Sequence, residues 1–141
     1  MEDVPWVRGI ACEAVLHEPD TGSWVFRFGP SVSLRVDAPW RVLSGGRIEV
    51  AAADHGQLFG LKHPVDAAAL TRELLSGRPI LELSVDPRSG DVTVDFGEGH
   101  LLQVFNNSSG YEGWTLAGAS GRLLVGLGGG GIATWGELGG R

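Results

Sequence analysis

The sequence is built from short stretches in which apolar and polar residues alternate, separated by turns that contain glycine or proline. Within residues 23–28, for example, Trp24, Phe26 and Phe28 fall on one face of an extended chain and the intervening residues on the other. A period of two is the signature of a β-strand with one buried face. Turn signals at intervals of about 8–12 residues are typical of an antiparallel sheet that curls into a barrel or a sandwich. We therefore expect a mostly β (α+β) fold.

The pattern occurs twice, at an offset of 68 residues. Residues in 19–36 recur as identical residues in 87–104: Pro19, Gly22, Phe28, Gly29, Leu34 and Val36 correspond to Pro87, Gly90, Phe96, Gly97, Leu102 and Val104. This repetition predicts a tandem duplication of one β-meander, with copies at 9–53 and 77–125. Trp40 and Trp114 also correspond once a longer loop is allowed in the second copy. We expect the apolar faces of both copies to meet in one core with pseudo-twofold symmetry.

One helix is expected between the copies, at residues 66–76. Asp66 is placed to cap its first turn, Gly77 follows its last turn, and Pro79 prevents its continuation. Its apolar stripe is expected to lie on the sheet and to contain Ala67, Leu70 and Leu74. The 141 residues are the size of one domain, so we expect a single domain over 1–141.

Composition excludes several classes of function. Seventeen acidic and eleven basic residues give a net charge of −6, which disfavours binding to the phosphates of a nucleic acid. The lone Cys12 cannot form an intramolecular disulfide, and the N-terminus lacks the pattern of a secretory signal. No apolar run is long enough to cross a membrane. The sequence therefore predicts a cytoplasmic protein without a nucleic-acid or membrane partner.

The glycine-rich segment 126–131 fits the dinucleotide-binding pattern G-x-G-x-x-G by its letters alone. The pattern requires a following helix and a further strand, and too few residues remain for them. The four histidines are far apart and have no second ligand at metal-binding spacing. Neither a cofactor nor a metal is expected, and the segment is interpreted as a turn between the last two strands.

No catalytic signature is present. Ser108, His100 and Asp95 could be combined as a triad, but Ser108 lies in no strand-to-helix elbow and has no oxyanion-hole motif. Cys12 has no basic neighbour that would lower its pKa, so we expect a small buried residue there. The sequence therefore favours a protein that is not an enzyme.

The best candidate site is the loop Asn106–Trp114, which combines hydrogen-bonding side chains with two aromatic residues. Trp114 is expected to anchor the core, whereas Tyr111 either covers it or is exposed for binding. Acidic residues outnumber basic ones around this loop, and a surface of one sign steers partners of the opposite sign. The predicted partner-binding residues are Asp91, Asp95, Glu98, Asn106, Asn107, Ser108, Tyr111 and Glu112.

One motif resembles a known family. The pattern F-x5-L-x-V followed by S-S-G-Y-E-G-W-x-L resembles that of a family of small bacterial proteins of unknown function, and the 39–41 segment and the 128–131 turn extend the resemblance. The matching residues are Phe96, Leu102, Val104, Ser108, Ser109, Gly110, Tyr111, Glu112, Gly113, Trp114 and Leu116. The resemblance implies no activity, although small acidic bacterial proteins of this kind are loosely associated with immunity to toxins.

The favoured function is therefore a non-catalytic protein-binding module of the immunity type. It would occlude a basic partner, such as a toxin domain, through an acidic face and the Asn106–Trp114 loop. Two alternatives stay open. One is a small-ligand-binding or enzymatic barrel with a pocket near His100, Asp95 and Glu112. The other is a homodimer or larger homo-oligomer that pairs exposed edge strands.

Overall fold

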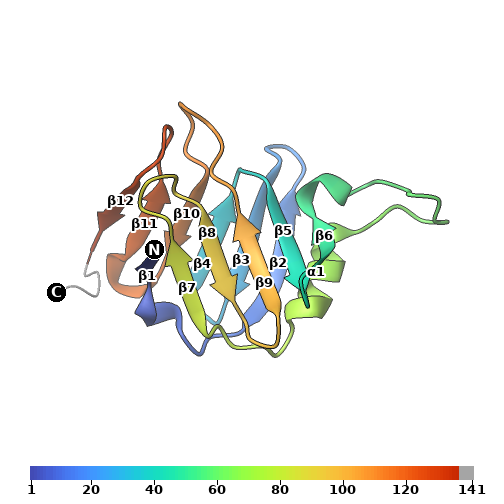
Figure 1. Ribbon diagram of the computed structural model, residues 1–141, viewed down its shortest axis with the longest axis horizontal. Coiled ribbons are helices and arrows are strands. Elements are labelled where there is room, and N and C mark those ends of the chain that lie inside the picture. Colours follow the sequence, from blue (N-terminus) through green and yellow to red (C-terminus); the bar gives the residue numbers. More distant parts are fainter. Residues whose placement is uncertain (137–141) are drawn as a thin grey trace.

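The computed structural model describes residues 1–136 and contains two six-stranded antiparallel sheets packed face to face (Figure 1). We name them sheet I, with strand order β1-β7-β8-β9-β5-β6, and sheet II, with strand order β12-β11-β10-β4-β3-β2. The last five residues of the predicted domain 1–141 lie outside the described residues. The strands of sheet I are β1 (Glu2–Asp3), β5 (Trp40–Ser44), β6 (Arg47–Ala51), β7 (Glu82–Val85), β8 (Val92–Asp95) and β9 (His100–Val104). Those of sheet II are β2 (Cys12–Glu18), β3 (Ser23–Phe28), β4 (Val32–Val36), β10 (Trp114–Ala117), β11 (Leu123–Gly126) and β12 (Ile132–Trp135).

The predicted mostly β class is confirmed, and the sandwich is the architecture found. The barrel alternative is wrong, because no strand ladder joins the two sheets anywhere in residues 1–136. Three of the four outermost strands have features that discourage pairing: β1 has two residues, and bulges interrupt β2 and β6. Helix α1 (Ala67–Leu75) contacts both β2 and β6. The helix thus occupies the side of the sandwich that a barrel would close with hydrogen bonds.

The two halves of the chain exchange strands between the sheets. The first half places β2, β3 and β4 in sheet II and then crosses to form β5 and β6 in sheet I. The second half places β7, β8 and β9 in sheet I and then crosses to form β10, β11 and β12 in sheet II. At the centre, Val36 pairs with Trp114 in sheet II, and Val104 pairs with Trp40 in sheet I. These pairs are equivalent under the sequence repeat, which supports the proposed duplication.

The core lies between the sheets and draws large side chains from both. Trp24 and Phe26 from sheet II contact Trp40 from sheet I, with ring centroids 5.0 and 5.2 Å apart. The buried apolar residues other than Val125 form one continuous cluster, as expected of a sandwich in which both inner faces interdigitate. The largest buried side chains are Trp40, Trp114, Phe26, Phe28, Leu34, Leu75, Ile80, Leu83, Leu102, Leu116, Val7 and Val36.

Helix α1 begins where the sequence predicts, because the Asp66 carboxylate accepts a hydrogen bond from the Ala69 N–H (3.0 Å). The predicted apolar stripe is wrong in part. The buried face consists of Ala67, Thr71 and Leu75, at a spacing of four, whereas Leu70 is exposed. Each turn of the helix inserts one of these residues into the gap between β2 and β6. The neighbouring row of leucines therefore lies at the margin of the gap, as Leu74 does, or in solvent, as Leu70 does.

No helix in residues 1–136 has the length and apolarity needed to cross a membrane. Three short 3-10 turns complete the described structure, at Pro5–Val7, Ala52–Asp54 and Ala119–Gly121.

Candidate functional site

The loop of residues 105–113, which connects β9 to β10, is fixed at its base by Asn106. The Asn106 amide nitrogen Nδ2 donates to two backbone carbonyls, those of Ser89 (3.0 Å) and Leu127 (2.9 Å). Its backbone N–H donates to the carboxylate Oδ1 of Asp91 (2.8 Å). Asn106 thus ties together three segments that are distant in sequence. Its side chain is used for structure and is not free to contact a partner.

The glycine-rich turn after β11 supports the same loop from beside it. The Gly129 N–H donates to the Ser108 carbonyl (2.8 Å), and the Gly113 N–H donates to the Gly126 carbonyl (3.0 Å). A Cβ atom at Gly128 would overlap the backbone of Gly110, so only glycine permits this approach. The segment that resembles a nucleotide-binding motif by its letters is therefore a backbone platform for the 105–113 loop.

Trp114 anchors the loop from below, as predicted. Its side chain is buried, and its indole Nε1–H donates to the Gly90 carbonyl (2.7 Å). Tyr111 takes the opposite role, because its side chain is 83% exposed. The alternative in which Tyr111 covers Trp114 is therefore wrong. The loop presents one aromatic ring to solvent and uses the other to hold its end in the core.

A surface hollow of about 690 Å³ lies against this loop. Its lining residues are Asp37, Asn107, Ser108, Gly110, Tyr111 and Glu112. The Ser108 hydroxyl oxygen accepts hydrogen bonds from the backbone N–H groups of Gly110 (3.1 Å) and Tyr111 (2.9 Å), which stabilises the bend that presents Tyr111. Carboxylates lie in two parts of the lining and there is no basic side chain among these six residues, so the hollow favours a cationic group.

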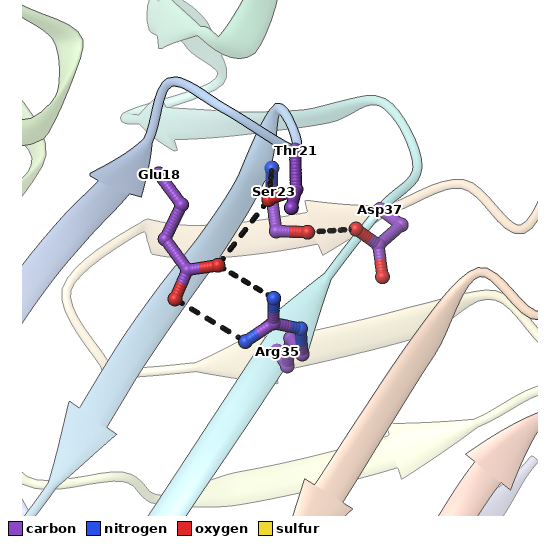
Figure 2. A network of polar contacts seen from close by, with 5 residues as sticks. All are labelled: Glu18, Thr21, Ser23, Arg35 and Asp37. Atoms are coloured by element: carbon purple, nitrogen blue, oxygen red, sulfur yellow. Dashed lines mark hydrogen bonds and ion pairs between the residues drawn. The ribbon is translucent and has the colours of Figure 1, made fainter.

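Asp37 enters the hollow from the first half of the chain, at the crossing between β4 and β5. Figure 2 shows the polar network that orients it: the buried Ser23 hydroxyl donates to the Asp37 carboxylate. Thr21 accepts a hydrogen bond from the Ser23 N–H (3.2 Å) and donates to the Glu18 carboxylate (3.2 Å). The β2–β3 turn and the Asp37 side chain are thereby fixed together.

Arg35 completes this network through two contacts with Glu18, of 2.5 and 3.3 Å (Figure 2). The hydrogen bonds from Arg35 lower the pKa of the Glu18 carboxyl below its ordinary value. The same pair raises the pKa of Arg35, so both groups stay charged at neutral pH. The ion pair joins β2 to β4 across the outer face of sheet II and keeps the turn that carries Thr21 in place.

Four of the eight predicted partner-binding residues line the hollow: Asn107, Ser108, Tyr111 and Glu112. Asp91 and Asn106 lie beside it, but the hydrogen bond from the Asn106 backbone N–H to the Asp91 carboxylate joins them to each other. Asp95 and Glu98 lie at the opposite end of the β8–β9 hairpin, where Asp95 accepts from the Gly97 N–H (2.8 Å) and Glu98 pairs with Arg78 (2.8 Å). The predicted acidic surface is therefore divided between the two ends of the sandwich.

The structure does not bring together the three residues of the predicted small-ligand pocket. His100 begins β9 and contacts Ser44 through Nε2 (3.4 Å), and Asp95 ends the neighbouring β8. Glu112 lies in the loop that follows the far end of β9. Five strand residues, at about 3.3 Å each, separate the two ends of β9. The same separation keeps Ser108 apart from His100 and Asp95.

Sequence reasoning missed two features. Asp37 was not identified because it comes from the other half of the chain, and only the crossing of strands between sheets brings it to the loop. An aromatic cluster was also missed: the His17 ring stacks on Trp24 at 4.2 Å and lies 4.9 Å from the His55 ring. His55 in turn accepts a hydrogen bond at Nδ1 from the Ala67 N–H (3.1 Å) and so caps α1. The sequence did contain a signal for part of this cluster: His17 and Trp24 lie at matching positions on either side of the predicted β2–β3 turn, where cross-strand partners are expected.

Fold and site together define a β-sandwich protein with an acidic, aromatic hollow beside a fixed loop. The chain belongs to a family of unknown function, DUF6188, whose family model matches residues 21–136. The matched region contains every residue that lines the hollow. No curated protein and no solved structure is significantly similar to the chain. Membership in a family of unknown function agrees with the resemblance seen in the sequence, whereas the specific motif and the link to toxin immunity stay predictions.

Proposed function

We propose that the protein is a non-catalytic binding module that recognises another protein at the hollow beside the 105–113 loop. The observation that carries this proposal is the exposure of Tyr111 (83%) at the rim of a hollow that also contains Asp37 and Glu112. Tyrosine supplies rigid contact area at a small cost in conformational entropy, and it is enriched among residues that dominate binding energy. An exposed aromatic ring on an anchored loop suits recognition.

The lining of the hollow offers a partner groups for hydrogen bonds, aromatic contact and ion pairs. It offers the amide of Asn107, an aromatic ring and two carboxylates, while the Ser108 hydroxyl already serves the loop itself. The loop is held by its side-chain and backbone hydrogen bonds before any partner arrives. Pre-organisation of this kind reduces the entropy lost on binding.

The partner that fits this hollow is basic. The carboxylates of Asp37 and Glu112 lie in a chain with a net charge of −6, so a cationic surface is attracted both at long range and at contact. The most concrete partner of this class is a toxin domain, which the protein would neutralise by covering its active surface, as immunity-type inhibitors do. Such inhibition requires occlusion and no turnover.

The test is affinity capture from an extract of the native host with the tagged full chain as bait. We expect a basic partner, encoded next to this gene, that is lost when the salt concentration is raised from about 50 mM to about 500 mM. Glu112→Arg and Tyr111→Ala should abolish capture with the fold intact by circular dichroism. Glu82→Arg is the matched control, because Glu82 is exposed at the opposite end of sheet I.

Equal capture by Glu112→Arg and the unaltered chain would exclude the hollow as the binding surface. Loss of capture in Glu82→Arg alone would place the binding surface at the other acidic end, near Asp95 and Glu98. Recovery of partners with no gene beside this one, in several genomes, would remove the immunity interpretation and leave protein binding in place.

A further inference from the structure

A second exposed feature projects from the other side of the molecule. The segment between β6 and α1 extends away from the sandwich as a long loop (Figure 1), and residues 56–64 are exposed without interruption. Its tip carries three large apolar side chains, those of Leu58 (51% exposed), Phe59 (66%) and Leu61 (61%). Large apolar side chains that gather on a projection indicate a contact surface.

The projecting loop is held in one shape. At its neck, the Gly56 N–H donates to the Val65 carbonyl (2.8 Å), and the Val65 N–H donates to the Gln57 carbonyl (2.8 Å). At its tip, the Leu61 N–H donates to the Leu58 carbonyl (2.7 Å), and Phe59 and Gly60 have φ angles of 47° and 78°. Two successive positive φ angles define a tight turn of type I′. Phe59 accepts a conformation that is uncommon for its residue type, and its side chain is exposed at the tip.

The charge of this loop is opposite to that of the whole protein. Residues 55–65 contain no acidic residue, but they contain Lys62, the only lysine of the chain, and the histidines His55 and His63. The hollow beside the 105–113 loop has the opposite character, with Asp37 and Glu112 and no basic side chain in its lining. One chain thus carries a convex apolar element with a cation beside it and a concave acidic element with an aromatic rim.

We propose that the Leu58–Leu61 tip of one molecule docks into the Asp37–Glu112 hollow of a second copy. Phe59 would contact the exposed Tyr111 ring, and Lys62 would meet the two carboxylates. Volume agrees with this pairing, because about 690 Å³ accommodates the few side chains of the tip. A second surface hollow, of about 400 Å³, is a poorer match, because its one carboxylate, Glu18, is already paired with Arg35, and Arg27 in its lining would repel Lys62.

The contact joins two different surfaces, so it is heterologous. After one contact forms, each terminal molecule still has a free loop or a free hollow, and the assembly grows head to tail. The interface is small, which makes the association weak and reversible. The inference rests on the proposed function, since it fills the same hollow, and it implies that self-assembly and partner binding compete.

Sedimentation equilibrium of the purified full chain tests this assembly. Between about 10 µM and about 1 mM, the average mass should rise beyond that of a dimer, and less so at about 500 mM salt. Phe59→Ser and Lys62→Glu remove the loop contact, and Glu112→Arg removes the hollow contact, so each variant should stay monomeric. Leu81→Ser is the matched control, because Leu81 is an exposed leucine outside both surfaces (56%) and its variant should still assemble.

An equimolar mixture of Phe59→Ser and Glu112→Arg gives the sharpest result, because neither variant creates a charge that complements the other. The mixture contains one intact loop and one intact hollow per pair, so it should form dimers that do not grow further. A monomeric unaltered chain at about 1 mM, or a mixture that stays monomeric while the unaltered chain assembles, overturns the proposal. Assembly that persists in both Phe59→Ser and Lys62→Glu also overturns it.

Two further measurements separate this inference from the proposed function. Phe59→Ser has an intact hollow, so it should still capture the basic partner. If the unaltered chain is monomeric but Glu112→Arg loses the partner, only self-assembly is excluded. If a monomeric chain sediments with phosphatidylcholine vesicles and Phe59→Ser does not, the tip serves a lipid surface and the docking proposal is overturned.

Discussion

Phe28 and Phe96 stack on each other across the interface of the two sheets, with ring centroids 6.3 Å apart and an interplanar angle of 28°. The two residues occupy equivalent positions of the sequence repeat, at the ends of β3 and just beyond β8. An aromatic residue of one half therefore contacts its own counterpart in the other half. This is the contact expected at a pseudo-twofold axis.

The Phe28–Phe96 contact predicts coupled energetics. Phe28→Leu and Phe96→Leu should each lower the free energy of unfolding by about 1 kcal/mol, because both side chains are buried and leucine fills most of the volume. Urea denaturation of both single variants and the double variant should give a coupling of about 0.5–1.5 kcal/mol. Strict additivity would show that the rings contribute only through the area that each buries.

Trp40 and Trp114 offer a comparison between equivalent positions with different partners. The Trp114 indole donates to the Gly90 carbonyl, whereas the buried Trp40 indole nitrogen has no hydrogen-bond partner among the described residues. Trp114→Phe should therefore be less stable than Trp40→Phe by about 1–3 kcal/mol, because it also leaves a buried carbonyl unpaired. Chemical denaturation of the two variants under identical conditions measures the difference. An equal loss would mean that packing alone determines both positions.

Asn106 is predicted to be a structural residue of the candidate site. Asn106→Ala removes two hydrogen bonds to backbone carbonyls and should cost roughly 2–4 kcal/mol. Asn107→Ala, the adjacent exposed residue, is the control and should change stability by less than about 0.5 kcal/mol. Hydrogen exchange should show that Asn106→Ala loosens residues 105–113 and 127–131 together. Loosening of the first segment alone would contradict the role of Asn106 as the link between them.

The Glu18–Arg35 pair predicts a dependence of stability on pH. Because Arg35 lowers the pKa of Glu18 in the folded protein, the stabilising contribution is present above the unfolded pKa of about 4.3. It is lost as the pH falls through the lower folded value. The difference in Tm between the unaltered protein and Glu18→Gln should therefore be positive at pH 7 and should shrink below about pH 4.

The same experiment in the Arg35→Gln background provides the control for that prediction. Without the guanidinium group, Glu18→Gln should change Tm little at either pH. A Tm difference between the Glu18 variants that stays the same from pH 7 to pH 3 would show that the pair contributes nothing measurable, which is the outcome for many exposed ion pairs.

The sequence by itself determined the class of the fold and the units from which it is built. Alternation in residues 23–28 depends only on the period of a strand, so it identified a half-buried strand directly. The Asp66 cap and the glycine at position 77 delimited the helix because capping involves residues a few positions apart. The loop at 106–114 was also visible, since it has no counterpart in the first half.

Only the tertiary structure decided which segments meet. The choice of sandwich over barrel depends on α1 entering between β2 and β6, which no local pattern encodes. The hollow needs Asp37 beside Tyr111, and these residues come together because β4 of the first half pairs with β10 of the second half in sheet II. The division of the acidic residues between two ends of the molecule has another cause: Asp95 and Glu98 lie at one end of the β8–β9 hairpin, and Glu112 follows the other end of β9. Local interactions fix strands, turns and caps. The position of a side chain relative to distant segments depends instead on the order of the strands in each sheet, and one alternating pattern of residues is compatible with many such orders.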